Sequence, residues 1–249
     1  MSDLAGAAVV SCHVETPLDD RAWAAFARFQ ERRPGGFPVA ALIRPPDPGE
    51  EAGREDDWLE RARAAAARGP LGHHTHWGGV TQARPLGGDP AERVLREGRW
   101  LRERGLAVGF FAGGGWYLDG GVAAAAAELG YVDCTATTYR LPYLEAGAAR
   151  LELPGPARIR LPGGALLPEL PATHSLGTVL RALLRPGGLG AGFVHVHFHD
   201  WDLLDRRRAL ALESALRLLA RRRRPLGLDA AAERLAGAPE VAWDEAFHG

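Results

Sequence analysis

Histidine, the side chain most often used to bind a metal or to move a proton near neutral pH, gathers at three places in this chain. Of the nine histidines in 249 residues, seven form three groups: His13; His73, His74 and His76; and His195, His197 and His199. The second group follows the first by about 60 residues, and the third follows the second by about 120 residues. Only the fold can bring such groups together, so we expect them to meet in one pocket.

Two of these histidines and one carboxylate form a candidate set of metal ligands. His74 and His76 are two residues apart on an expected strand, so both side chains can face the same side. Glu15 can add an oxygen ligand, and two histidines with one carboxylate and an open position for water are a common catalytic zinc arrangement. We therefore predict that these three residues bind Zn²⁺ or another divalent transition metal that activates water for hydrolysis.

Two further histidines are candidates for proton transfer. Imidazole titrates near neutral pH, so His13 and His199 can act as general base and general acid. We expect Asp200, directly after His199, to orient a histidine or to contact the substrate. His195 and His197 alternate with apolar residues along a strand that must be buried on one side, which favours structural roles for both.

Aromatic side chains follow two of the glycine-rich stretches. They offer flat surfaces suited to stacking on a sugar ring, although they can also pack beneath the loops. The candidates for substrate binding are Trp77, Trp116 and Tyr117.

The elements that must position these residues alternate between strands and helices. Apolar, β-branched runs predict strands at 7–15, 37–43, 71–76, 106–111, 131–136 and 191–199, with short strands at 157–161 and 166–171. Amphipathic or capped runs predict helices at 20–33, 58–68, 90–104, 119–128, 176–184 and 203–222. This alternation indicates a mostly parallel sheet or barrel, whose active site lies at the carboxyl ends of the strands. No repeat or linker divides the chain, so we expect one domain over residues 1–249.

The composition limits the function further. The net charge of −1 argues against a nucleic-acid partner, and no run approaches the ~18 apolar residues of a membrane span. Two cysteines and the lack of a basic, signal-like N-terminus favour a cytoplasmic location. All 30 basic residues are arginine, which excludes Schiff-base lysine chemistry and a phosphate-loop lysine.

Five short motifs, in order along the chain, resemble those of the NodB-homology polysaccharide deacetylases, or carbohydrate esterase family four. The resemblance covers most of the chain, from the first expected strand to the strand that ends at His199. The matching segments are Ser11-Cys12-His13-Val14-Glu15, Pro70-Leu71-Gly72-His73-His74-Thr75, Phe110-Phe111-Ala112-Gly113, Glu128-Leu129-Gly130-Tyr131-Val132-Asp133 and Val196-His197-Phe198-His199-Asp200.

The resemblance implies an α/β fold, a distorted and incomplete (β/α) barrel of about seven strands. It also implies a metal-dependent hydrolase that removes an N-acyl group, typically acetyl, from an amino sugar or sugar conjugate. The expected partner is therefore a small-molecule amino sugar or glycan in the cytoplasm.

The chain departs from the family pattern at three positions. His13 stands where the family has its base aspartate, Gly78 where it has its second metal histidine, and Phe111 where it has the arginine that holds the base. These replacements leave open a catalytically degenerate fold that binds a sugar or a partner protein. An amidohydrolase or PHP-type metal hydrolase also uses His-x-His, although such folds usually carry it on the first strand.

Overall fold

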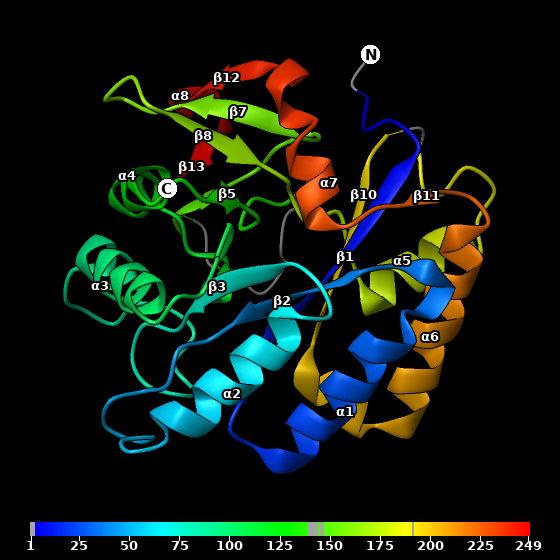
Figure 1. Cartoon of the computed structure of the whole chain (residues 1–249). Helices are drawn as coiled ribbons and strands as arrows, with labels where there is room; N and C mark the ends of the chain where they lie inside the picture. Colours follow the sequence, from blue (N-terminus) through cyan, green and yellow to red (C-terminus); the bar gives the residue numbers. More distant parts are fainter. Residues whose placement is uncertain (1–2, 139–143, 145–146, 191) are drawn as a thin grey trace.

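A mostly parallel sheet forms the centre of the molecule, and helices cover its outside (Figure 1). The computed structural model describes residues 3–138, 144, 147–190 and 192–249. Six strands pair in parallel in the order β10-β1-β2-β3-β4-β5. They are β1 (Ala7–Val14), β2 (Val39–Ile43), β3 (Leu71–Thr75), β4 (Phe110–Gly113), β5 (Val132–Asp133) and β10 (Val194–His199). The predicted α/β class with a mainly parallel sheet is confirmed.

One continuous segment contacts both outer strands of this set. Residues 166–175, which we call the linking segment, begin as β8 (Leu166–Glu169), paired with β5, and end as β9 (His174–Ser175), paired with β10. Between them, the Leu170 amide donates to the Asp133 carbonyl and the Thr173 amide donates to the His195 carbonyl. The strands therefore curve round as a distorted, incomplete barrel, in which β8 and β9 pair with the two outer strands but not with each other.

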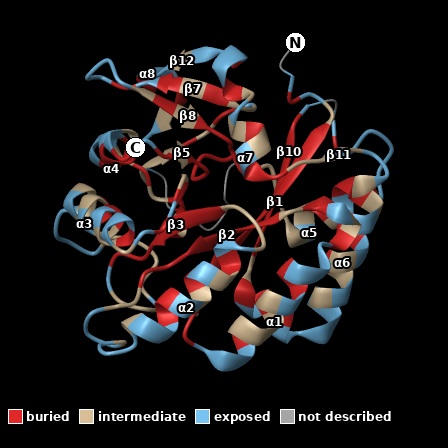
Figure 2. Cartoon of the chain, viewed as in Figure 1, coloured by how far each residue is buried: buried red, intermediate tan, exposed pale blue. Residues whose placement is uncertain are grey.

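Side-chain caps explain where several helices begin. Asp19, Asp89 and Asp119 each accept hydrogen bonds from backbone amides of the first turn that follows. The helices turn their buried faces to the sheet and their exposed faces to solvent (Figure 2). They are α1 (Asp20–Arg32), α2 (Glu55–Ala66), α3 (Pro90–Glu103), α4 (Gly120–Glu128), α5 (Leu176–Leu183), α6 (Arg206–Ala220), α7 (Leu228–Ala232) and α8 (Trp243–Ala246). Within the described ranges, no helix combines the length and apolar character needed to cross a membrane.

The remaining elements are short. The strands are β6 (Arg150–Leu151), β7 (Ala157–Arg160), β11 (Arg224–Pro225), β12 (Glu240–Ala242) and β13 (Phe247–His248). The 3₁₀ turns are η1 (Pro34–Gly36), η2 (Gly114–Trp116), η3 (Asp200–Leu204) and η4 (Leu235–Gly237). The helix predicted over 203–222 is therefore wrong at its start. Asp205 caps the amides of Arg207 and Arg208 and separates η3 from α6.

Alternate residues of the strands enter two different cores. One core lies between the sheet and the helices and includes Val10, Phe26 and Trp58. The other includes Val9, Leu42, Phe110, Ala112 and Leu170 on the opposite faces of the strands. The polar residues of the site lie on this second face, toward the carboxyl ends of the strands.

Candidate metal centre and active site

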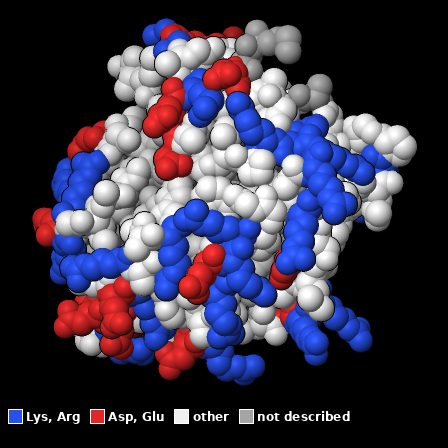
Figure 3. Space-filling view, turned by 45° about the vertical axis from the view of Figure 1, so that its right-hand side comes forward, with Lys and Arg blue, Asp and Glu red and all other residues white. Residues whose placement is uncertain are grey.

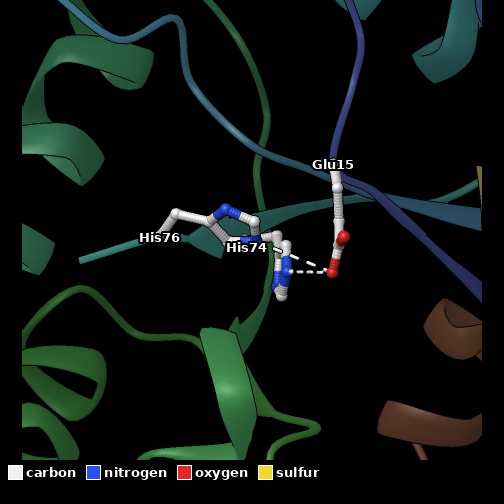
Figure 4. A group of neighbouring side chains, drawn as sticks. All are labelled: Glu15, His74 and His76. Carbon is white, nitrogen blue, oxygen red and sulfur yellow. Dashed lines mark ion pairs between the residues drawn. The ribbon is translucent and has the colours of Figure 1, made fainter. Parts of the chain in front are cut away.

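β3 and the residue that follows β1 bring three candidate ligands together. His74 lies on β3 and His76 directly follows its last residue, so these two histidines, two residues apart, face the same side; Glu15 comes directly after β1. Glu15 Oε1 lies 3.7 Å from His74 Nε2 and 3.6 Å from His76 Nε2 (Figure 4). One ligand atom from each residue lies within 4.8 Å of the other two.

Backbone carbonyls fix which ring nitrogen of each histidine carries the proton. His74 Nδ1 lies 2.8 Å from the Ala112 carbonyl oxygen, and His76 Nδ1 lies 2.7 Å from the Val80 carbonyl oxygen. A carbonyl oxygen only accepts, so both Nδ1 atoms donate and, in a neutral ring, Nε2 keeps a lone pair. Both Nε2 atoms are buried and have no hydrogen-bond partner in the described part of the chain.

The charges around this point favour a bound cation. Burial lowers the pKa of His74 to about 4, although Glu15 opposes the shift, so the ring is neutral at pH 7. Burial raises the pKa of Glu15, but His74, His76 and His199 outweigh it and hold the pKa well below its usual range. The His74 lone pair and the Glu15 carboxylate therefore face each other without a proton between them, and with His76 Nε2 they form the donor set of a zinc-type site.

Trp201 holds the glutamate in position, and the sequence patterns did not identify it. Its indole N–H donates to Glu15 Oε2 at 3.1 Å. Its ring stacks on that of His199, with a centroid separation of 4.7 Å and an angle of 12°. Trp201 thus connects the end of β1 to the end of β10.

His199 lies between two carboxylates. Its Nε2 is 3.5 Å from Glu15 Oε1, and its Nδ1 is 3.7 Å from Asp202 Oδ2. Burial alone lowers the pKa of His199, but Asp202 and Glu15 outweigh it and raise the pKa above its usual value. A histidine that keeps its proton near neutral pH suits the role of proton donor.

The carboxylate beside the His199 ring is Asp202, whereas the sequence predicts that Asp200 orients a histidine or contacts the substrate. Asp200 is fully buried and accepts hydrogen bonds from the Thr16 amide and hydroxyl and from the Trp201 amide. It fastens the chain after β1 to the turn after β10, and none of these three donors is a histidine. The 3₁₀ turn η3 brings Asp202 back, so that the His199 amide donates to Asp202 Oδ2 at 3.0 Å. The spacing of three residues between His199 and Asp202 was the sequence signal for this contact.

The ring of His13 packs against that of His74, one of the three candidate ligands. Its ring centroid is 4.6 Å from that of His74 and 5.6 Å from those of His197 and Trp116. Burial, together with the neighbouring imidazoles, lowers the pKa of His13 well below its usual value. The ring is therefore neutral at pH 7, which leaves it able to accept a proton but makes it a weak base.

The other two histidines of β10 differ from each other. His195 bonds through both ring nitrogens, to Ser11 Oγ at 2.8 Å and to the Leu170 carbonyl oxygen at 3.0 Å. The expected structural role of His195 is confirmed. His197 packs edge-on against Trp116 at 4.7 Å, and its Nδ1 has no hydrogen-bond partner among the described residues.

The three predicted sugar-binding aromatics do not form one exposed platform. Trp77 is buried and donates its indole N–H to the Gly114 carbonyl, and its ring packs edge-on against Tyr117. The Tyr117 hydroxyl donates to Asp119. Trp116 contacts the rings of His13 and His197, so it is the member of the three that reaches the histidine cluster.

Asp133, another polar residue at a strand end, faces away from this site. It pairs in register with Phe111 of β4, which pairs with His73, so these three side chains lie on the helix side of the sheet. Its carboxyl accepts from Thr135 and adjoins Glu169 on β8. Asp133 therefore lies at the end of a strand but on the opposite face of the sheet from the candidate ligands.

Comparisons with known proteins give a limited result. No protein-family model matches the sequence, and no curated protein matches it. Among solved structures, the chain is similar to a 4-α-glucanotransferase from Thermococcus litoralis, at 13% identity and a TM-score of 0.48, covering 97% of this chain and 40% of that one. It is also similar to a family 4 carbohydrate esterase from Streptomyces lividans solved with acetate, at 9% identity and a TM-score of 0.43, covering 93% and 91% of the two chains.

The second structure is from the family whose motifs this sequence resembles. At such identities and with TM-scores below 0.5, neither likeness carries information about the activity of this chain. The chain also spans well under half the length of the glucanotransferase. The case for a function therefore depends on the geometry of the site.

Proposed function

We propose that this chain is a metal-dependent hydrolase that removes an N-acyl group, most simply acetyl, from an amino sugar or a sugar conjugate. One observation carries the proposal: two buried imidazole nitrogens, His74 Nε2 and His76 Nε2, face the Glu15 carboxylate and have no hydrogen-bond partner in the described chain. Buried polar atoms are normally satisfied, so such a convergence supports a bound cation. The motif order along the chain supports the choice of substrate.

In this proposal Glu15, His74 and His76 hold the metal. A divalent metal, when bound, supplies Lewis acidity that activates water and polarises the acyl carbonyl. The carbonyls of Ala112 and Val80 keep both imidazoles in the tautomer that binds a metal through Nε2.

The proton transfers are assigned to two other histidines. His199, whose pKa is raised beside Asp202, protonates the leaving amine. His13, kept neutral by burial, receives the proton that water loses. Trp116, packed against both His13 and His197, is the aromatic residue that we assign to substrate contact.

The test is elemental mass spectrometry of the purified protein, together with an assay of acetate release from N-acetylglucosamine and its oligomers. We expect one equivalent of metal per chain and measurable release in the wild type, and neither in His74→Ala. The matched control is His248→Ala, which removes an exposed histidine at the far end of the chain. Full activity in His74→Ala, or no metal in any variant after reconstitution, contradicts the proposal.

One observation favours a second candidate, a fold that binds a sugar without hydrolysing it. The lowered pKa of His13 makes it a weak base, and Phe111, where a family arginine is expected, is buried on the helix side of the sheet against Tyr131. Stoichiometric metal and sugar binding without acetate release would support this candidate.

A further inference from the structure

A groove of about 750 Å³ opens beside the candidate metal centre, at the carboxyl end of β10. The first turns of α5 and α6 form two of its sides. Its apolar lining comes largely from Leu176, Leu180, Phe198 and Ala211.

The groove and the metal centre share a wall. His199 and Trp201 both line the groove. The same two residues contact Glu15: His199 Nε2 lies 3.5 Å from Glu15 Oε1, and the Trp201 indole donates to Glu15 Oε2. A molecule that lies along the groove therefore has one end beside the candidate ligands and the other beside the two helices.

Positive charge lines part of this groove. Arg181 of α5 and Arg207 and Arg208 of α6 line it, against a single carboxylate, Asp202. Arg208 binds that carboxylate, with Nη1 3.0 Å from Oδ1. Arg207 has no hydrogen-bond or ion-pair partner for its guanidinium among the described residues, and the Arg181 guanidinium donates only to the Gly177 carbonyl. Two arginines are therefore available for a ligand.

The position of these arginines is not explained by the stability of the helix. The first three residues of α6 are Arg206, Arg207 and Arg208, and its first turn has no acidic residue. The helix dipole disfavours cations at this end, and the Asp205 cap offsets only part of that effect. The face on which α6 comes forward is rich in arginine (Figure 3). An anion bound in the groove would pair with this local excess of positive charge.

We propose that the groove binds a phosphate group of the substrate, so that the hydrolysed compound is a phosphorylated N-acylamino sugar. The inference rests on the proposed function and narrows its substrate class. Guanidinium groups form paired, charge-assisted hydrogen bonds with phosphate oxygens, and Arg181 and Arg207 supply them from two helices. The apolar lining contacts the uncharged part of the substrate, and the N-acyl group lies beside His199 and Glu15.

The first experiment compares kcat/KM for N-acetylglucosamine, its 1-phosphate, its 6-phosphate and the uridine diphosphate conjugate. We expect at least one phosphorylated compound to exceed the free sugar by about tenfold or more, the effect of one or two charge-assisted hydrogen bonds. The two sugar monophosphates and the uridine diphosphate conjugate distinguish recognition of a phosphate monoester from recognition of a diphosphate diester. Arg181→Gln/Arg207→Gln should lose this preference and keep the rate on the free sugar, whereas Arg206→Gln, next to the groove but not lining it, should keep both.

The second experiment separates this inference from the proposed function. Isothermal titration of the same sugars and of inorganic phosphate into His74→Ala measures binding without hydrolysis. Phosphate-dependent binding in His74→Ala that disappears when Arg181→Gln/Arg207→Gln is added supports the groove even if no sugar is hydrolysed. No gain from phosphate in either experiment, or an equal loss in Arg206→Gln, overturns it.

Discussion

The two sides of β3 each place histidine next to a carboxylate, with opposite results. On the helix side, His73 Nε2 lies 2.9 Å from Glu97 Oε2, and the Thr75 hydroxyl donates to the same oxygen. Arg93 donates to the other Glu97 oxygen at 2.7 Å and also to the Trp77 carbonyl. On the inner side, the Nε2 atoms of His74 and His76 lie 3.6–3.7 Å from Glu15 and have no hydrogen-bond partner among the described residues.

Burial and residue type do not separate these two sides, because His73, His74 and His76 are all buried. The contact with the carboxylate does: His73 Nε2 hydrogen-bonds to Glu97, whereas the Nε2 atoms of His74 and His76 face Glu15 without a hydrogen bond. In each of the three rings, one buried nitrogen has no partner among the described residues. The Glu97 network, which we define as His73, Thr75, Arg93 and Glu97, joins β3 to α3 by charge-assisted hydrogen bonds within the protein. The inner histidines leave their Nε2 acceptors facing a third acceptor. The comparison indicates that the outer side supplies stability, whereas the inner side has a donor set that could hold a metal ion.

The largest expected effect is on the outer side. Glu97→Ala leaves the Arg93 guanidinium and the His73 ring without their shared partner, so we expect the free energy of unfolding to fall by about 3 kcal/mol. Urea denaturation measures this loss. Glu97→Gln keeps the shape and one acceptor, so its free energy of unfolding should fall by less. A fall below about 1 kcal/mol in Glu97→Ala would mean that the network does not stabilise β3, and it would contradict the comparison.

The inner side should respond to metal instead. Zinc at about 100 times its dissociation constant should raise the free energy of unfolding of the wild type by about 2.7 kcal/mol, because only the folded chain holds the site together. His74→Ala should show no such gain, and Glu97→Gln should keep it. Thermal unfolding with and without zinc measures both. A zinc response in His74→Ala equal to that of the wild type would remove the distinction between the two sides.

A third buried site, formed by the carboxyls of Asp133 and Glu169, sharpens the comparison. Neither a cation nor a histidine pairs with these carboxyls in the described part of the chain. Burial, with Asp133 adjoining, raises the pKa of Glu169 well above its usual value, and burial raises the pKa of Asp133 to about 6. The folded state therefore holds protons that the unfolded state has released above pH ~4. The contribution of these two carboxyls to stability should be greatest in acid and should fall, by up to about 1.4 kcal/mol per pH unit for each proton, as pH rises through their folded pKa values.

Glu169→Gln tests this directly, since glutamine carries no charge at any of these pH values. Urea unfolding at pH 5, 6, 7 and 8 should give a flatter profile for the variant than for the wild type. Parallel profiles would show that the two carboxyls do not retain their protons in the folded chain.

The smallest effect is expected at Asp202. Asp202→Asn removes a negative charge that helps to raise the pKa of His199, so the proton donor is lost at a lower pH. In the acetate-release assay, the alkaline limb of the pH profile should move down by up to about one unit. The acid limb serves as the internal control, and an unchanged alkaline limb would remove His199 from the role of donor.

The parts of the structure that local chemistry determines could be predicted from the sequence. Aspartate caps set the starts of α1 and α4, and alternation along β3 predicted that His74 and His76 share a side. The position of Glu15 after β1 followed from the carboxyl-end rule for parallel strands. These features depend on neighbours within a few residues, or on a rule that holds for every parallel sheet.

The parts that depend on distant partners could not be predicted. β11, β12 and β13 have two or three residues each and exist through pairing with β1, β7 and β6. Local sequence patterns do not predict such pairing. In the site, a turn after β10 decided that Asp202, and not Asp200, lies beside His199, and strand register decided that Asp133 faces the helices.

The linking segment has a consequence for motion. Its Leu170 and Ala172 amides bond to the β5 side, and its Thr173 amide bonds to β10, so both sides of the barrel share one stretch of backbone. An opening that frees this stretch loosens the β5 side and β10, the strand that ends at His199, together. Amide hydrogen exchange should therefore occur at similar rates in the linking segment and in β10, as one cooperative unit. On this view the geometry of the site depends on the cooperative stability of the barrel and not on any single loop.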